Sequence, residues 1–240
     1  MVLLVGIPFL TWRYIEFSVR INPTEGFSYF DVVYYMLSEP MYFLFFFLSL
    51  CVAYLCYLGM YRSLHTQIVY RYCSKRAIWI FVVKYSAALA VIESLWFSLS
   101  ILVFSVPYID SFCNFDQANS LMHLALKGQD WTGTLPNAFL IFALSFIVCF
   151  ICFWVIELLL ILCWWLFDNI ILGLLITFSF YLVDVYVFPS LYSQQYFLHS
   201  QWIGQNIFFR FFIPVAYVIV LFILGYVFAE RKEFYREKVK

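Results

Sequence analysis

The chain has 240 residues, a length typical of one domain, and its composition is unlike that of a soluble protein. Hydrophobic residues make up 65% of it, charged residues only 12%, and the mean hydropathy is +0.91, whereas soluble domains are about 45–50% apolar and about 25% charged. The 14 Lys and Arg balance 14 Asp and Glu, so no net basic field supports binding to nucleic acid. These values predict an all-α, polytopic integral membrane protein that forms a single transmembrane domain.

Six apolar segments are candidates for membrane-spanning helices, each of which needs about 20 mainly apolar residues. The first apolar run is short, so the first span must continue past the polar residues Arg13 and Glu16. The third span accommodates Lys84 near its start, and Asp168 with Asn169 predicts a tight turn between the fourth and fifth spans. The predicted spans are 1–17, 41–61, 78–106, 137–167, 170–188 and 213–229.

Positive charge is distributed unequally between the connecting segments. The loop 62–77 holds four Lys or Arg residues and the C-terminal tail holds five, which makes nine. The connections 18–40, 107–136 and 189–212, counted together with Arg13, hold four. Because cytoplasmic loops are enriched in Lys and Arg, this difference predicts six spans in the plasma membrane with both termini in the cytoplasm.

The basic loop 62–77 contains a segment that can form about two turns of helix. Its apolar residues recur every three to four positions and so share one face, with basic residues at the junction to the third span. One interpretation is a surface helix held at anionic headgroups; the other is a rigid lever that docks into a cytosolic partner. The candidate partner-binding residues are Arg62, Leu64, Ile68, Arg71, Tyr72, Lys75 and Arg76.

Three acidic residues, Glu93, Glu157 and Asp184, lie within predicted spans. A charged side chain at such a depth costs at least about 2.5–3.5 kcal/mol, so each should face protein or water. Glu93 lies near a stripe of small residues that permits close helix approach, namely Ser86, Ala90, Ser94 and Ser98. The three acids are candidates for the lining of a conduit, a gate or a proton site. The alternative is a protonated carboxyl that holds helices together, and for Asp184 a position at the outer interface is favoured.

Several kinds of site have no sequence support. The chain has no GxxxxGK[ST] motif for binding ATP phosphates and no GxSxG nucleophile elbow. His65, His123 and His199 lie in separate loops without paired spacing, so no metal site is predicted. Cys149 and Cys152 form a CxxC within an apolar run, where thiols behave as small hydrophobic groups. No catalytic residue and no cofactor are therefore predicted in this chain.

One run, which opens the third span, resembles a known family. Permease subunits of bacterial ATP-binding cassette transporters of the type-2 exporter family, especially the small six-span permeases of lantibiotic and other antimicrobial-peptide systems, carry a similar sequence at this place. The matching residues are Arg71, Tyr72, Ser74, Lys75, Arg76 and Trp79. The resemblance implies that loop 62–77 holds a coupling helix, that a cytosolic subunit binds ATP and Mg²⁺, and that two permeases form a dimer. It also implies export of an amphipathic peptide or lipid-like substrate, and re-entrant structure before the last span.

Two other functions use the three acidic residues instead of the basic loop. One is an intramembrane enzyme with Glu93, Glu157 or Asp184 as acid–base groups, and the other is a proton-coupled carrier or channel. Neither has a paired catalytic motif to support it. The sequence leaves open the substrate, the direction of transport and whether the dimer is homomeric.

Overall fold

The computed structural model describes residues 9, 12, 13, 16, 28–36, 74–114, 137–167, 169–186 and 207–231. These residues are mostly helical, in agreement with the all-α prediction, and their only β-type pairing is an isolated bridge between Ser28 and Ser111. The elements in chain order are α2 (Tyr29–Met36), α5 (Lys75–Ser105), η2 (Val106–Tyr108), α7 (Ala138–Phe167), α8 (Ile170–Tyr186), α10 (Ile207–Phe228) and η4 (Ala229–Arg231).

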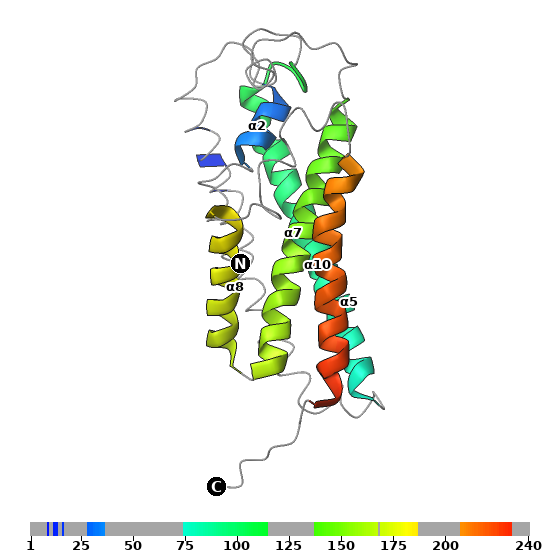
Figure 1. Ribbon diagram of the computed structural model, residues 1–240. Coiled ribbons are helices and arrows are strands. Elements are labelled where there is room, and N and C mark those ends of the chain that lie inside the picture. The colour runs from blue at the N-terminus through cyan, green and yellow to red at the C-terminus, as the bar shows by residue number, and fades with distance from the viewer. Residues whose placement is uncertain are drawn as a thin grey trace.

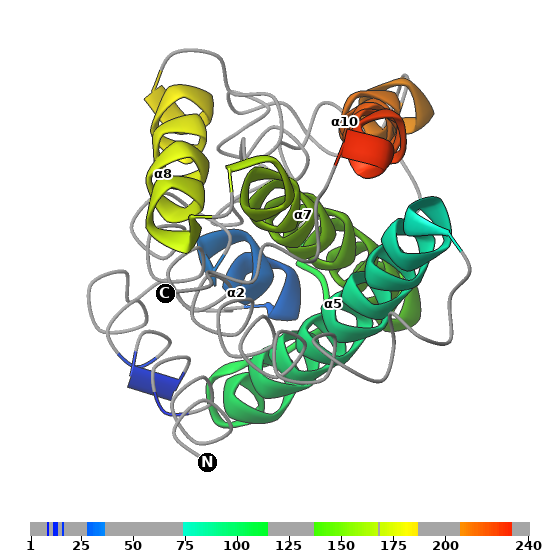
Figure 2. The same cartoon turned by 90° about the horizontal axis from the view of Figure 1, so that it is seen from below.

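The four long helices form an upright bundle, and the short helix α2 lies near one end of it (Figure 1). Helix α7 contacts α5, α8 and α10, and Figure 2 shows it between these neighbours. It is apolar around its whole circumference, as expected of a helix enclosed on several sides. Helix α7 is therefore the centre of the described bundle, and most of the buried side chains come from it or from α5.

Two helices are long and apolar enough to cross a membrane, α5 with its η2 extension and α7. With 31 and 30 residues, each is about 45 Å long, which exceeds the roughly 30 Å hydrocarbon core of a bilayer. Shorter apolar stretches occupy Ile171–Phe180 in α8 and Val215–Phe228 in α10. The predicted span 41–61 and most of 1–17 lie outside the described residues, so the number of six spans stays a prediction.

Several element boundaries differ from the sequence expectation. Helix α5 begins at Lys75, inside the predicted loop 62–77, because the Ser74 hydroxyl caps the helix by accepting a hydrogen bond from the Ala77 amide at 3.1 Å. Helix α10 begins at Ile207, inside the predicted connection 189–212. Hydropathy alone predicts the starts of these two helices too late, because it assigns polar residues to the loop although a helix can include them in its first turns.

The turn between α7 and α8 is short. Asn169 caps α8, and its side-chain oxygen accepts hydrogen bonds from the amides of Ile171 and Leu172 at 3.0 and 3.2 Å. Asn137 caps the start of α7 in the same way, by accepting from the Leu140 amide at 2.7 Å. These two caps satisfy backbone donors that would otherwise lack partners at helix starts.

Candidate docking site and buried carboxyl pair

The first turn of α5 carries the two predicted partner-binding residues that the structure describes, Lys75 and Arg76. The other five predicted residues lie outside the described part of the chain, namely Arg62, Leu64, Ile68, Arg71 and Tyr72. The structure thus places the last part of the predicted docking segment on a capped helix that continues for 31 residues. A force applied at Lys75 or Arg76 therefore acts on the end of a rigid element.

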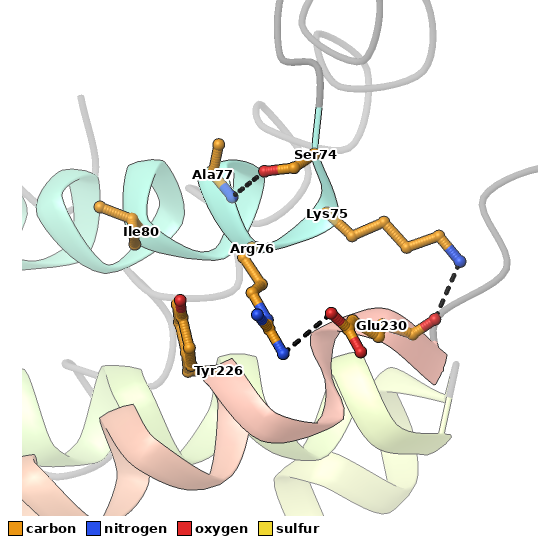
Figure 3. A pocket seen from close by; sticks show the side chains of 7 residues that line it. All are labelled: Ser74, Lys75, Arg76, Ala77, Ile80, Tyr226 and Glu230. Carbon is orange, nitrogen blue, oxygen red and sulfur yellow. Dashed lines mark hydrogen bonds and ion pairs between the residues drawn. The ribbon is translucent and has the colours of Figure 1, made fainter.

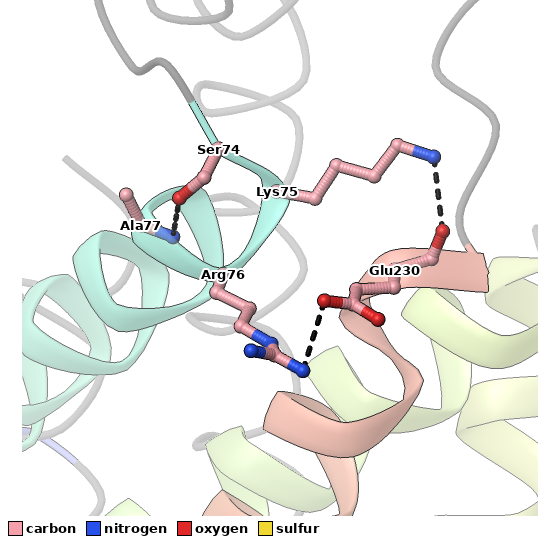
Figure 4. A network of polar contacts seen from close by, with 5 residues as sticks. All are labelled: Ser74, Lys75, Arg76, Ala77 and Glu230. Carbon is pink, nitrogen blue, oxygen red and sulfur yellow. Dashed lines mark hydrogen bonds and ion pairs between the residues drawn. The ribbon is translucent and has the colours of Figure 1, made fainter.

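Both basic residues bind Glu230 in η4, the short helix that directly follows the C-terminal end of α10 (Figures 3 and 4). The Arg76 guanidinium pairs with the Glu230 carboxylate at 2.8 Å and lies 4.9 Å from the centre of the Tyr226 ring. The Lys75 ammonium donates a hydrogen bond to the Glu230 backbone oxygen at 3.0 Å. These contacts connect the start of α5 to the end of α10 across 155 residues of sequence.

Each partner of this ion pair lies at the unfavourable end of its helix. A helix N-terminus carries a partial positive charge and a C-terminus carries a partial negative one. A cation in the first turn and an anion after the last turn therefore each decrease helix stability by about 0.3–1 kcal/mol. The first turn of α5 has no acidic residue to offset its two cations. The Arg76 and Glu230 side chains are 44% and 63% exposed, so their pairing stabilises the fold by at most about 1 kcal/mol. Helix stability alone does not account for this concentration of charge.

An open pocket of about 530 Å³ lies beside this ion pair (Figure 3). It combines two basic side chains and one carboxylate with an apolar wall formed by Ala77, Ile80 and the Tyr226 ring. Such a surface suits a protein segment that presents an acidic and an apolar side chain together. The lining residues are Ser74, Lys75, Arg76, Ala77, Ile80, Tyr226 and Glu230.

Trp79 fixes α5 beneath the pocket. Its indole N–H donates a hydrogen bond to the Phe222 backbone oxygen at 3.0 Å, and its ring packs directly on Gly225. On the α7 side its ring centre is 5.5 Å from that of Trp165. In the sequence, Trp79 is indicated only by the family resemblance. Glu230 is not indicated at all, because it lies within a charged tail in which no single residue stands out. The sequence feature that could have indicated this contact is the small residue Gly225 within an apolar run, since a glycine allows a large side chain of another helix to approach closely.

The structure brings two of the three predicted acidic residues together. Glu93 on α5 and Glu157 on α7 are buried, 7% and 1% exposed, and their carboxyl groups face one another. Asp184 lies in the last turn of α8, and its side chain is outside the description. The pairing of Glu93 with Glu157 depends on how α5 and α7 are aligned, which no sequence motif specifies.

The small-residue stripe of α5 lies against its neighbours as the spacing predicts. Ser86, Ala90, Ser94 and Ser98 are all fully buried. The Trp154 indole of α7 donates a hydrogen bond to the Ser86 hydroxyl at 3.2 Å, which links the two helices directly. Close approach of α5 and α7 is therefore what brings the two carboxyl groups together.

Within the described residues, no three His, Cys, Asp or Glu side chains lie close enough to hold a metal ion. The Cys149, Cys152 and Cys163 thiols are buried on α7, and the Cys113 thiol is partly buried. Comparison with known proteins finds no matching family model, no matching curated protein and no matching solved structure.

Proposed function

We propose that this chain is a membrane-spanning permease subunit of an ATP-binding cassette transporter. It exports an amphipathic peptide or lipid-like molecule, using ATP that a separate cytosolic subunit binds with Mg²⁺ and hydrolyses. The observation that carries the proposal is the first turn of α5, where Lys75 and Arg76 border an open pocket and also bind the end of α10. The residue pattern of this turn is the one that resembles the permease family.

A location in the lipid bilayer of the bacterial plasma membrane is part of the proposal. Large apolar side chains are exposed along the described helices, among them Ile92 at 63%, Val103 at 60% and Ile171 at 66%. Exposure to water costs about 25 cal/mol per Å² of apolar surface, whereas contact with lipid has no such cost. Soluble monomers rarely expose extended apolar surface of this kind. The multi-pass arrangement with cytoplasmic termini places the basic start of α5 in the cytosol.

The proposed mechanism is a shift between inward-open and outward-open states. Closure of two ATP-bound cytosolic subunits moves the docked segment at the start of α5. Because Lys75 and Arg76 are joined to Glu230, and Trp79 to Phe222, the end of α10 moves with it. The two helices then tilt as one unit around α7. A second permease, identical or similar, completes the conduit, since one chain of this size is small for it.

Co-purification tests the partner. A tagged chain is extracted from its native membranes in mild detergent, and the bound proteins are identified by mass spectrometry. The expected result is a cytosolic subunit with a GxxxxGK[ST] motif, present in stoichiometric amount and active as an ATPase. Absence of any such subunit from an intact, monodisperse preparation contradicts the proposal.

Charge substitutions test whether Arg76 itself is bound by the partner. Arg71→Glu combined with Arg76→Glu is expected to abolish co-purification while leaving membrane insertion intact. To isolate Arg76, the single variant Arg76→Glu is compared with a control that combines Arg76→Glu with Glu230→Arg, which restores an internal ion pair with reversed polarity. Failure of this control to recover binding assigns Arg76 a direct contact with the partner, whereas full recovery shows that only the internal pair matters.

A proton-coupled carrier is the second candidate, favoured by the convergence of Glu93 and Glu157. It differs from the first in needing no ATPase. Purified chain in lipid vesicles with an imposed pH gradient is expected to show no substrate movement if the ATP-driven proposal holds. Uptake driven by the gradient alone identifies the carrier instead.

A further inference from the structure

Helices α5 and α7 are aligned so that Glu93 and Glu157 occupy equivalent positions. The rings of Phe97 and Phe153 meet edge to face with centres 6.4 Å apart. The helices are antiparallel, so four residues back along α5 and four residues forward along α7 reach the next turn on the same two faces. Those positions are Glu93 and Glu157. The helix alignment alone therefore brings the two carboxyl groups together.

The two carboxyl groups are enclosed and lack other partners. None of their four oxygen atoms has a hydrogen-bond partner among the described residues. The ionisable group that acts on each is the other carboxyl. Lys84 lies nine residues before Glu93, about 14 Å along α5, and is exposed. Other ionisable residues on α7 and on the helices that contact α5 or α7 include Asp31 on α2, Cys152 on α7, Asp184 on α8, and Arg210 and Tyr217 on α10.

Keeping both of these adjacent carboxyl groups charged inside the helix bundle has a high cost in free energy. Each buried charge loses its hydration, and the two charges repel one another at close range. A proton on one carboxyl removes the repulsion and lets that group donate a hydrogen bond to the other. One hydrogen bond between the carboxyl groups then gives a partner to two of the four buried oxygens, without any further side chain.

We propose that Glu93 and Glu157 form one proton-binding site between α5 and α7, which retains protons at neutral pH and loosens the contact of the two helices when it loses them. The ligand is the proton itself, and the site binds and releases it without any change in covalent bonds to carbon. The inference does not depend on ATP-driven transport, since the pair lies within the helix bundle and far from the start of α5.

Infrared spectroscopy of the full chain in lipid vesicles tests this site. Protonated carboxylic acids give a C=O stretching band that carboxylates lack, and a difference spectrum between wild type and Glu93→Gln/Glu157→Gln isolates the contribution of the pair. The expected result is a band of the pair at pH 7, where an isolated glutamate with a pKa of about 4.3 is ionised. The control Asp110→Asn changes an exposed acidic residue and is expected to leave the band unchanged.

Single substitutions test whether the two groups act together. In Glu93→Gln the remaining carboxyl has no charged neighbour and gains an amide donor, so its band should disappear at a lower pH than in wild type. Groups that interact titrate as a pair, and the expected decrease of the midpoint is about one pH unit or more. Glu157→Gln should show the same direction. An unchanged midpoint in both single variants means independent groups and overturns the proposal.

The wild-type spectrum is decisive even if the double variant does not fold. A wild-type spectrum without any protonated carboxyl band at pH 7 shows that both groups are ionised, held by a cation or by a basic residue such as Arg210, and overturns the proposal. A band that persists unchanged in a folded double variant belongs to other residues and has the same consequence.

Discussion

The indole ring of Trp79 occupies the space directly above Gly225, in which any side chain at position 225 would begin. The indole N–H donates a hydrogen bond to the Phe222 backbone oxygen at 3.0 Å, and the indole ring also contacts the Trp165 ring of α7. A single side chain of α5 therefore contacts both α10 and α7. The absence of a Cβ at position 225 is what allows the three helices to approach one another at this level.

The first prediction is that Gly225→Ala destabilises the protein although alanine is the better helix former. The added Cβ would collide with the Trp79 ring, which cannot move without losing its hydrogen bond. Overpacking of this kind costs about 1–3 kcal/mol, against a gain of about 1 kcal/mol in helix propensity. Thermal unfolding in detergent measures the difference.

Gly173→Ala on α8 is the matched control for that measurement. Its Cβ would meet the Cys163 Cβ and a Leu160 methyl at 3.4 Å, which is ordinary van der Waals contact. This variant is expected to be as stable as wild type or slightly more stable. Equal melting temperatures for the two alanine variants would show that Trp79 does not pack on Gly225.

The second prediction concerns Asp31, which fixes the start of α2 to the loop after η2. Its carboxylate accepts hydrogen bonds from the Ser28 amide at 2.9 Å, the Ser28 hydroxyl at 2.8 Å and the Asn114 side-chain amide at 2.8 Å. Asp31→Ala leaves these buried donors unpaired, and each such loss costs about 1–3 kcal/mol. All three bonds end on the same Asp31 oxygen, which Asp31→Asn can replace with a neutral and weaker acceptor, so its melting temperature should lie between those of Asp31→Ala and wild type. Asp110→Ala, at an exposed position nearby, should melt like wild type.

The third prediction is a pH dependence that comes from Tyr29, on α2 outside the predicted spans. Burial raises the pKa of the Tyr29 phenol, while the nearby Ser145 hydroxyl acts in the opposite direction and Cys149 adds a smaller upward contribution. Unfolded tyrosine ionises near pH 10. Above that pH the unfolded chain has fewer bound protons than the folded one, so stability decreases as pH rises. The decrease should be smaller in Tyr29→Phe, measured as the difference in melting temperature between pH 8 and pH 11, on the order of a few degrees. Identical decreases in both proteins would contradict it.

The sequence predicts the elements better than their contacts. Long apolar runs and the polar pair before Ile170 indicate where α7 ends and α8 begins, because hydropathy and helix caps are local properties. The start of α5 at Lys75 is less visible, since two cations in a first turn resemble a loop. The partners of Glu93 and Arg76, by contrast, are far from them in the sequence. They depend on the rotation and alignment of two helices whose contacting residues are more than 60 positions apart in the sequence. Sequence periodicity indicates only which face of a single helix is polar.

The last prediction is that the two ends of α5 lie on opposite sides of a membrane. With 31 residues, α5 is about 46 Å long, more than the roughly 30 Å of a hydrocarbon core. In a variant without its seven native cysteines, Ser74→Cys should react with a membrane-impermeant maleimide only in inverted vesicles, and Asp110→Cys only in whole cells. Ile92→Cys, at an exposed position in the middle of the helix, should react from neither side, because lipid suppresses formation of the thiolate that maleimide requires.

These three positions also separate a membrane helix from a helix in a soluble bundle. If α5 were exposed to water, all three cysteines would react in the same compartment, and Ile92→Cys would react as readily as the others. Reaction of Ser74→Cys in whole cells and of Asp110→Cys in inverted vesicles would reverse the orientation. The basic first turn of α5 would then lie outside the cell, where no ATP-hydrolysing subunit can reach Arg76, and the proposed coupling would fail even though the helix spans the membrane.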